Sequence, residues 1–300
     1  MEYHDPVMLQ ECVEALNINP NGIYVDATFG GGGHTRAVLQ RLKNGRLLAF
    51  DQDHDARINA DKIDSRSFTF IEANFRYIKQ FLKLQGILNI DGLLADLGVS
   101  SHQFDTADRG FSTRFDAKLD MRMDRKAKVT ARTVINEYTS EELHRIFGMY
   151  GEIRNAKTLA SAIVSARVNK PIETINDLKG IIDRHAPKGK EFKYYAQVFQ
   201  AIRIAVNDEL KALEDLLLQC AGIIKKGGRL VVISYHSLED RMVKNFFNKG
   251  KFFGEAEKDI YGNLKRPFEP VNKKPIVASI EEISRNNRAR SAKLRIARKV

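Results

Sequence analysis

A run of four glycines, Gly30 to Gly33, lies between a short apolar segment and a segment of helical character, residues 35–42. Glycine lets a ligand approach the backbone closely, and a strand, a glycine-rich turn and a helix in this order are typical of nucleotide-type binding sites. Asp51 ends the next apolar run, 18 positions after Gly33. That is close to the spacing at which an acidic residue binds ribose hydroxyls in Rossmann-like folds. These residues together predict a site for a ligand that carries a ribose.

The glycines do not form the fingerprint of a dinucleotide site, because the residue three places after Gly33 is Arg36. A dehydrogenase is therefore disfavoured. The third apolar run leads to Asn74 and Phe75, which are well placed to flank an adenine, although a lone aromatic residue after a strand is more often part of the core. His34 is either a ligand contact or a cap at the start of the helix. This order of residues suits an adenosyl ligand without a pyrophosphate.

These residues need a scaffold, and the first hundred residues alternate short β-rich apolar runs with helical stretches, which is typical of a parallel sheet with crossover helices. Strands are expected at residues 23–27, 47–51, 68–71, 92–96 and, after a long gap, 229–234. Parallel strands place ligands at their carboxyl ends. Before the last strand we predict a helix that Asn207 caps and that Lys225, Lys226 and Gly227 close, with its leucines packed on the sheet.

The segment between the fourth and fifth expected strands shows no strand alternation. Residues 105–206 have the pattern of loops and helices, with Pro171 and Pro187 between the helical stretches. We therefore expect a helical domain of residues 105–206 that is inserted into an α/β domain of residues 1–104 and 207–300.

The charge balance favours a polyanionic partner. The chain has 49 lysine and arginine residues against 38 aspartate and glutamate residues, a formal net charge of +11. Each phosphate that such a surface neutralises releases counterions, so nucleic acid is the natural candidate. The alternative is a basic surface that only aids solubility.

Two segments are candidates for contact with nucleic acid. Basic and aromatic residues interleave at Lys188, Lys190, Lys193, Tyr194 and Tyr195. The stretch 285–299 holds five arginines and two lysines without an acid, which favours contact with phosphates. The tyrosines suit base stacking and core packing equally well.

The remaining composition limits the class of protein. Cys12 and Cys220 are the only cysteines, too few for a disulfide framework or a thiolate zinc site, and we expect both in the core of a protein from a reducing compartment. No apolar run approaches the roughly 20 residues of a membrane span, and the first residues lack the pattern of a leader peptide. No residues have metal-ligand spacing, and His236 is expected to be a structural hydrogen-bonding group rather than a base. A soluble, cytoplasmic protein without a metal is predicted.

Several motifs spread over nearly the whole chain are specific enough to suggest a family. They are His4-Asp5-Pro6-Val7-Met8-Leu9, Asp26-Ala27-Thr28-Phe29-Gly30-Gly31-Gly32-Gly33-His34, Asp96-Leu97-Gly98-Val99-Ser100-Ser101, Arg109-Gly110-Phe111-Ser112, Leu119-Asp120-Met121-Arg122-Met123-Asp124, Phe199-Gln200-Ala201-Ile202-Arg203-Ile204 and Ser237-Leu238-Glu239-Asp240-Arg241. In these motifs the chain closely resembles the bacterial ribosomal RNA small subunit methyltransferase H family, also called MraW. It departs from the family pattern at Gly31, where arginine is common, and at His102 and Asn287, where proline is common.

The resemblance implies a class I S-adenosylmethionine-dependent methyltransferase, with a Rossmann-like α/β sheet and an inserted all-helical domain that recognises the substrate. The implied reaction is N4-methylation of a cytidine in the decoding region of 16S ribosomal RNA, with S-adenosylmethionine as methyl donor. The implied partner is small-subunit ribosomal RNA or the small subunit itself, with a second copy of the chain as a further candidate and no membrane. Carried over by motif, the cofactor contacts are Gly32, Gly33, His34, Asp51, Phe75, Asp96 and Gln103.

The N4 amine of cytosine is a weak nucleophile, so the site must orient it towards the methyl group and accept its hydrogens. As a hypothesis, Asp96 or a nearby backbone carbonyl accepts a hydrogen bond from the amine, and Ser100 or Ser101 holds the base. Asp96 binding only the cofactor is the alternative. The target base must leave any stack, which is easier in a single-stranded loop.

Two other functions compete with this one. An adenine-N6 or DNA methyltransferase would predict two prolines and an aromatic residue after the fourth strand, and Asp96 is followed there by Leu97, Gly98 and Val99. A ribosome-assembly factor without catalytic activity is disfavoured by Asp51 and the intact glycine turn.

Overall fold

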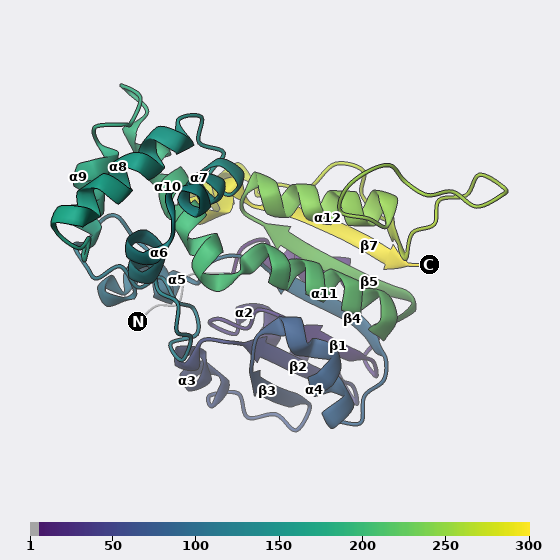
Figure 1. Cartoon of the computed structure of the whole chain (residues 1–300). Helices are drawn as coiled ribbons and strands as arrows, with labels where there is room; N and C mark the ends of the chain where they lie inside the picture. The colour runs from purple at the N-terminus through teal and green to yellow at the C-terminus, as the bar shows by residue number, and fades with distance from the viewer. Residues whose placement is uncertain (1–5) are drawn as a thin grey trace. The chain divides into compact units, whose positions relative to one another are not determined.

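The computed structural model describes residues 6–300 and divides into two compact units (Figure 1). The first, which we call the sheet unit, contains the described residues up to Gly98 together with Leu210–Val300. The second, the helical unit, is Val99–Glu209. No helix in the described part of the chain is long and apolar enough to cross a membrane.

The sheet unit is built on one seven-stranded sheet. The strands are β1 Ile23–Asp26, β2 Arg46–Asp51, β3 Phe68–Glu72, β4 Ile90–Asp96, β5 Ile224–Ser234, β6 Phe268–Pro270 and β7 Lys293–Lys299. Their order is β3-β2-β1-β4-β5-β7-β6, in which β1 to β5 are parallel and β7 runs antiparallel to both of its neighbours. This mostly parallel sheet is of the Rossmann-like kind that the sequence predicts. The five strands expected from the sequence are confirmed, and β6 and β7 were not expected.

Helices cover both faces of the sheet (Figure 1). They are α1 Leu9–Ala15, α2 Gly33–Leu39, α3 Arg57–Ala60, α4 Ile78–Leu84, α11 Glu209–Ile223, α12 Ser237–Lys249 and α13 Ile280–Arg285. Successive strand residues point to opposite faces, so that Val231 packs with α1 and α2 while Val232 packs with α4, α11 and α12. Cys12 lies in the first of these cores and Cys220 in the second, as predicted. Burial on both faces explains why the parallel strands are almost wholly apolar.

The helical unit contains α5 Ser101–Asp105, α6 Ala131–Glu137, α7 Ser140–Met149, α8 Ala156–Asn169, α9 Ile175–Ile182 and α10 Glu191–Asn207. Polar caps fix where these helices begin. Thr139 and Glu142 form a reciprocal capping box at α7, and Thr174 does the same with Asp177 at α9. Apolar residues from α6 to α10 form a separate core.

The helix predicted from Asn207 to Gly227 has different ends in the structure. Asn207 is the last residue of α10, Asp208 has a positive φ of 51°, and α11 begins at Glu209. Asn207 does not cap α11, because its amide donates to Met121 O at 2.8 Å and accepts from Met123 N at 2.7 Å. Lys225 to Gly227 lie in β5 and do not close the helix. The leucines of α11 pack on the sheet, as predicted.

Candidate active site

Three carboxylates lie at the carboxyl ends of adjacent strands. Asp26, Asp51 and Asp96 are the last residues of β1, β2 and β4, and β1 lies between the other two strands. Burial raises the pKa of Asp26 and of Asp96 to about 6, and that of Asp51 to about 7. Parallel sheets bind ligands at this edge, so the edge is the candidate site.

Asp51 connects the second strand to the glycine turn. Its Oδ2 accepts a hydrogen bond from Gly30 N at 2.8 Å, and its Oδ1 accepts one from Asp53 N at 2.8 Å. An ionised carboxylate has about four acceptor positions, so both oxygens keep capacity for hydroxyl donors. Asp51 is therefore suited to hold a ribose and at the same time fixes the turn beside it.

The turn needs its glycines for different reasons. Gly32 has a φ of +74° and is the residue before α2. A Cβ on Gly33 would lie 2.5 Å from Pro6 Cγ, so only glycine allows the N-terminal segment to approach α2. The first N–H groups of α2, from Gly33 and His34, have no acceptor within the helix and are suited to bind a ligand.

His34 does not cap α2, since the capping position is Gly32, so that alternative from the sequence is wrong. Its ring is buried, with Nε2 at 3.1 Å from Val7 O and Nδ1 at 3.9 Å from Asp96 Oδ2. Burial lowers the pKa of His34. Both ring nitrogens face protein groups, so a contact to a ligand would come from the backbone.

Asp96 is held on two sides. Tyr235 Oη donates to Asp96 Oδ1 at 2.7 Å, and Asp96 N donates to Thr28 Oγ1 at 2.7 Å. The Asp96 side chain is still 22% exposed, so it is accessible to a ligand. Burial raises the pKa of Tyr235 well above its ordinary value, which keeps the phenol protonated and able to donate.

The sequence did not identify Tyr235 or Asp26 as site residues. Tyr235 directly follows β5, and Asp26 ends β1, so the rule that ligand-binding groups follow parallel strands would have selected both. Asp26 is only 2% exposed; it accepts from Thr35 Oγ1 at 2.7 Å and from Thr28 N at 3.1 Å. Its contacts hold α2 and the start of the glycine turn in place.

Phe75 follows the third strand and opens a short 3-10 helix, Phe75–Tyr77. Its ring is partly buried against the core of the sheet unit, which is consistent with the core interpretation as well as with a ligand contact. Asn74 caps this turn, and its amide donates to Gln52 Oε1 at 2.8 Å. Asn74 and Phe75, which are predicted to flank an adenine, are therefore both held in place, Asn74 by hydrogen bonds and Phe75 by packing on the core.

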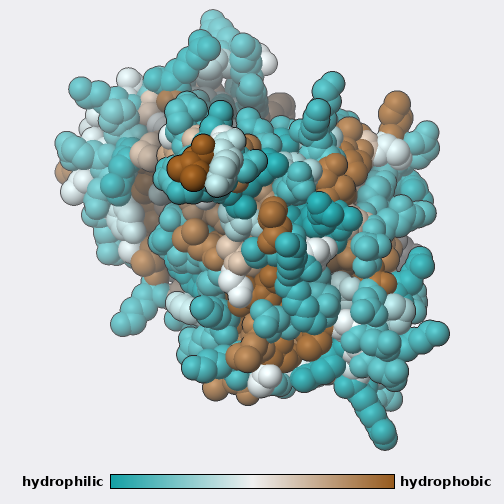
Figure 2. Space-filling model, turned by 90° about the vertical axis from the view of Figure 1, so that its right-hand side faces the viewer, coloured by the Kyte–Doolittle hydropathy of each residue, from teal (hydrophilic) through white to brown (hydrophobic). Residues whose placement is uncertain are grey.

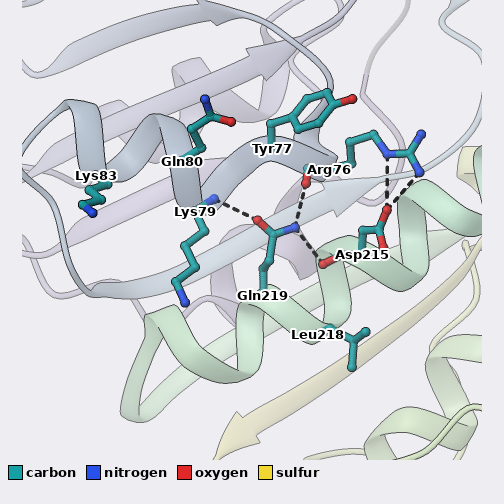
Figure 3. Close-up of a pocket in the computed structure, with 8 residues that line it drawn as sticks. All are labelled: Arg76, Tyr77, Lys79, Gln80, Lys83, Asp215, Leu218 and Gln219. Atoms are coloured by element: carbon teal, nitrogen blue, oxygen red, sulfur yellow. Dashed lines mark hydrogen bonds and ion pairs between the residues drawn. The ribbon is translucent and has the colours of Figure 1, made fainter.

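A shallow pocket lies behind this segment, between α4 and α11 (Figure 3). Arg76 donates to Asp215 Oδ2 at 2.9 Å, and Gln219 accepts from Lys79 N at 3.1 Å while donating to Arg76 O at 2.7 Å. These polar groups bind one another across the pocket. These hydrogen bonds join the segment after Phe75 to α11, and we call them the clamp.

Ser100, Ser101 and Gln103 belong to the helical unit. Ser100 caps α5: its Oγ accepts from Gln103 N at 3.2 Å, and Gln103 Oε1 accepts from Ser100 N at 3.0 Å. Ser101 is the first residue of α5 and is partly buried. The cap therefore occupies the Gln103 carbonyl and one acceptor position of Ser100, and it leaves the Ser100 hydroxyl hydrogen available to donate.

Two further family motifs meet in the helical unit. The buried Arg109 guanidinium donates to Arg122 O at 3.0 Å and to Met123 O at 3.2 Å. Arg122 in turn pairs with Asp120 at 2.7 Å. These residues, which the sequence left without a role, hold the loop before α6 together.

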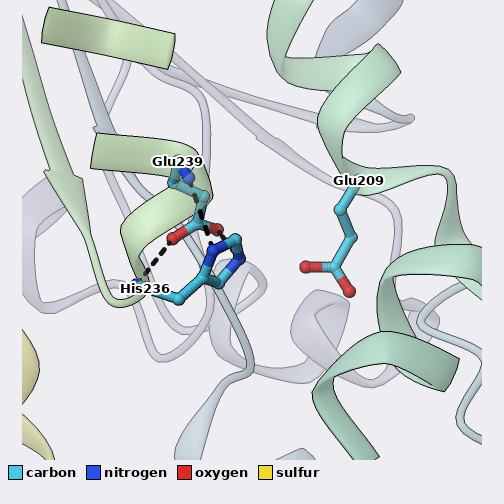
Figure 4. A group of neighbouring side chains, drawn as sticks. All are labelled: Glu209, His236 and Glu239. Atoms are coloured by element: carbon cyan, nitrogen blue, oxygen red, sulfur yellow. Dashed lines mark hydrogen bonds and ion pairs between the residues drawn. The ribbon is translucent and has the colours of Figure 1, made fainter. Parts of the chain in front are cut away.

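His236 is the N-cap of α12 (Figure 4). Its Nδ1 accepts from Glu239 N at 3.3 Å, and Glu239 Oε2 accepts from Tyr235 N at 2.9 Å. The expectation of a structural hydrogen-bonding role for His236 is confirmed. The cap also fixes the backbone of the residue that binds Asp96.

The basic stretch 285–299 is not an isolated tail, because its last residues form β7 in the sheet. Arg295 is 6% exposed and donates to Asp240 at 2.6 Å, and Arg298 donates to Glu269 at 3.1 Å. The expected phosphate contact is therefore wrong for Arg295. Figure 2 shows one face of the molecule, on which hydrophilic side chains predominate, in keeping with the 29% of charged residues.

Of the two tyrosines considered for base stacking, Tyr194 is a core residue. Its side chain is buried, and its hydroxyl donates to Asn155 Oδ1 at 2.8 Å. Tyr195 is partly exposed. Base stacking is therefore wrong for Tyr194.

Comparison with known proteins shows the family to which the chain belongs. The model of the MraW methylase family matches residues 1–300. The chain belongs to this family. A protein of Cytophaga hutchinsonii named ribosomal RNA small subunit methyltransferase H is 62% identical over 295 residues, which are 98% of this chain and 99% of the relative. A protein of the same name from Christiangramia forsetii is 56% identical over 301 residues, covering 100% of this chain and 99% of the relative.

Solved structures are less similar. A putative methyltransferase from Streptococcus mutans in complex with SAH has a TM-score of 0.41 and 14% identity, with 97% of each chain covered. A putative rRNA methylase from Clostridium thermocellum has a TM-score of 0.43 and 12% identity, with 98% of each chain covered. The fold assignment rests on the strand order and on the family.

Proposed function

We propose that this chain transfers a methyl group from S-adenosylmethionine to small-subunit ribosomal RNA in the cytoplasm, and that the acceptor is N4 of a cytidine in the decoding region. Family membership supports methyl transfer, and the names of the relatives support the RNA. The position of Asp96 carries the proposal for an amine acceptor. Its carboxylate is held by Tyr235 and remains partly exposed at the edge where ligands bind.

The residues at this edge fit S-adenosylmethionine, which when bound supplies a methyl group activated by its sulfonium. Asp51 has acceptor capacity for the ribose hydroxyls, and Phe75 keeps part of its ring exposed for the adenine. Gly32, Gly33 and His34 present backbone groups at the turn. We propose Asp96 and Gln103 for the methionine end, as the family resemblance implies.

The amine of cytosine becomes acidic as it forms a bond to carbon, so the site needs an acceptor for its hydrogen. The pKa of Asp96, which burial raises to about 6, leaves the group ionised at neutral pH and a better base than an exposed carboxylate. Tyr235 occupies Oδ1 and thereby fixes the direction in which the other oxygen points. We propose that this oxygen accepts the amine hydrogen and that positioning supplies most of the rate.

Ser100 and Ser101 follow Asp96 by four and five positions in the chain. We propose that their hydroxyls donate to the polar groups of the target base, since the cap leaves the Ser100 hydrogen available. The inserted unit would recognise the RNA around the target.

The test is transfer of radiolabelled methyl from S-adenosylmethionine to small ribosomal subunits from cells that lack this gene, followed by nucleoside analysis. The native protein should label N4-methylcytidine, and Asp51→Ala should lose label through weaker cofactor binding. Label in another nucleoside would contradict the acceptor, and tight cofactor binding without label on any RNA would contradict the enzymatic function.

The role of Asp96 needs its own comparison. Asp96→Asn removes the charge and should lower kcat at least about tenfold even at saturating cofactor, in addition to the weaker cofactor binding expected from its proposed contact with the methionine end. Asp91→Asn is the matched control, because Asp91 lies near the start of the same strand, where it accepts from Ile23 N and pairs with Lys225. A weaker cofactor affinity with unchanged kcat for Asp96→Asn would show that Asp96 only binds the cofactor.

A further inference from the structure

The first turn of α10 carries an aromatic ring that the fold leaves in solvent. Phe192 is 88% exposed, whereas Tyr194, two residues on, is 4% exposed. A phenyl ring in water leaves its apolar area unburied, so Phe192 keeps its ring accessible to a partner. Sequence patterns did not single out Phe192.

Phe192 stands beside a second ring. Its ring packs edge-on against Tyr195, with centroids 6.3 Å apart and an interplanar angle of 88°. Tyr195 is itself fixed, because its hydroxyl donates to Asp183 and the ammonium of Lys179 lies 5.5 Å from its ring centre. The pair therefore offers an aromatic surface that is partly ordered before any partner binds.

Several positively charged residues lie close to Phe192 and Tyr195 in the sequence. Lys188, Lys190, Lys193 and Arg184 are all exposed and, among residues 6–300, form no ion pair. Asp183 and Glu191, the acidic residues of the same segment, accept hydrogen bonds from Tyr195 and from Gly189 N, and among the described residues neither forms an ion pair with these cations. The cations are thus available for an anionic partner.

An exposed ring flanked by free cations matches the chemistry of unpaired nucleic acid. Bases stack on aromatic side chains, and lysines neutralise the adjoining phosphates. A duplex would present its phosphates but no free base face. An apolar protein partner would have to cover several unpaired lysines together with a single phenyl group.

We propose that Phe192, supported by Tyr195, stacks on an unpaired base of the RNA substrate, while Lys188, Lys190 and Lys193 bind the flanking phosphates. This rests on the proposed function only in taking RNA as the substrate. The surface lies within the helical unit and is separate in sequence from every residue proposed for methyl transfer. It assigns the RNA recognition proposed for the helical unit to these residues at the start of α10.

The test measures binding of a fluorescein-labelled single-stranded RNA of mixed sequence to the full chain by fluorescence anisotropy. Phe192→Leu keeps an apolar side chain but cannot stack, and it should weaken binding by roughly fivefold to a hundredfold. Phe192→Trp keeps an aromatic ring that can stack, so it should bind the RNA about as tightly as the native protein does. Phe253→Ala is the matched control, since Phe253 is 81% exposed in the sheet unit, and it should leave binding unchanged.

The phosphate contacts have a separate signature. Replacing Lys188, Lys190 and Lys193 together by glutamine should reduce the slope of log affinity against log salt by about 2. A Phe192→Leu variant that binds as tightly as the native protein, or a Phe253→Ala variant that is equally weakened, would overturn the stacking surface. An unchanged salt slope would overturn the phosphate contacts.

Methyl transfer by the native protein is measured in parallel, so the two proposals fail separately. Normal methylation with binding that is insensitive to Phe192→Leu removes the stacking surface and leaves the function. Binding that depends on Phe192 without methylation of any RNA removes the function and leaves the surface.

Discussion

Removal of one oxygen atom tests how Asp96 acts. Tyr235→Phe deletes the hydroxyl that donates to Asp96 Oδ1 at 2.7 Å and keeps the ring, which lies against Gly98. A hydrogen bond to a charged group contributes about 1.5–3 kcal/mol. One pKa unit corresponds to about 1.4 kcal/mol, so loss of the bond should raise the pKa of Asp96 by about 1 to 2 units above its value of about 6.

The direction of the effect follows from the active form. An ionised Asp96 accepts the amine hydrogen, so activity falls as the pH drops through the pKa of this group. In Tyr235→Phe the fall should begin about 1 to 2 pH units higher, and the rates of variant and native protein should converge at alkaline pH. Initial rates of methyl transfer at saturating cofactor, measured across this pH range, give the comparison.

Tyr24→Phe is the control for loss of a buried tyrosine hydroxyl. Tyr24 is buried in the same unit, and its hydroxyl accepts from Asn19 N at 2.7 Å, away from the site. Its pH profile should match that of the native protein. A fall in the activity of Tyr235→Phe at the same pH as in the native protein would contradict this role of Tyr235. An equally large shift in Tyr24→Phe would contradict it as well.

Three further predictions concern stability and cofactor binding. Because the three strand-end carboxyls have pKa values raised above 3.8 in the folded state, the protein without cofactor should lose a few kcal/mol of stability as the pH rises from about 4 to 7; urea midpoints should fall over this range, and less so in Asp51→Asn. Gly33→Ala should destabilise the fold by about 1–3 kcal/mol through its clash, whereas Gly180→Ala, which meets nothing within 4 Å, should stabilise it slightly; equal urea midpoints would contradict this. Gln219→Ala should loosen the Phe75 segment and raise the cofactor Kd by about threefold to tenfold, which isothermal titration calorimetry can check; an unchanged Kd would contradict the clamp.

Local patterns were sufficient for the parallel strands and for part of the site. Short apolar runs that alternate with helical stretches and end at polar or turn residues are typical of buried parallel strands, so the ends of β1, β2 and β4 were predictable. Asp51 could be selected because the spacing from Gly33 to the end of the second strand is fixed by the βαβ unit. Motif resemblance added the family, which the comparison confirms.

Local sequence patterns could not predict that one helix ends at Asn207 and the next begins at Glu209. The residues on either side favour helix, and only the side chain of Asn207, which binds the backbone of Met121 and Met123, shows why the chain stops there. That contact joins residues more than eighty positions apart. Helix propensity depends on local residues and therefore cannot predict this long-range contact.

The sequence by itself determined the parallel strands, the position of Asp51 at the end of the second strand and the family, because each depends on neighbours in the chain. Only the tertiary structure brought Tyr235 to Asp96 across 139 positions, buried Arg295 against Asp240 and left Phe192 in solvent. The physical reason is that partners and exposure are properties of the packed chain: whether a tyrosine donates, an arginine is paired or an aromatic ring is covered depends on which distant segments fold against it.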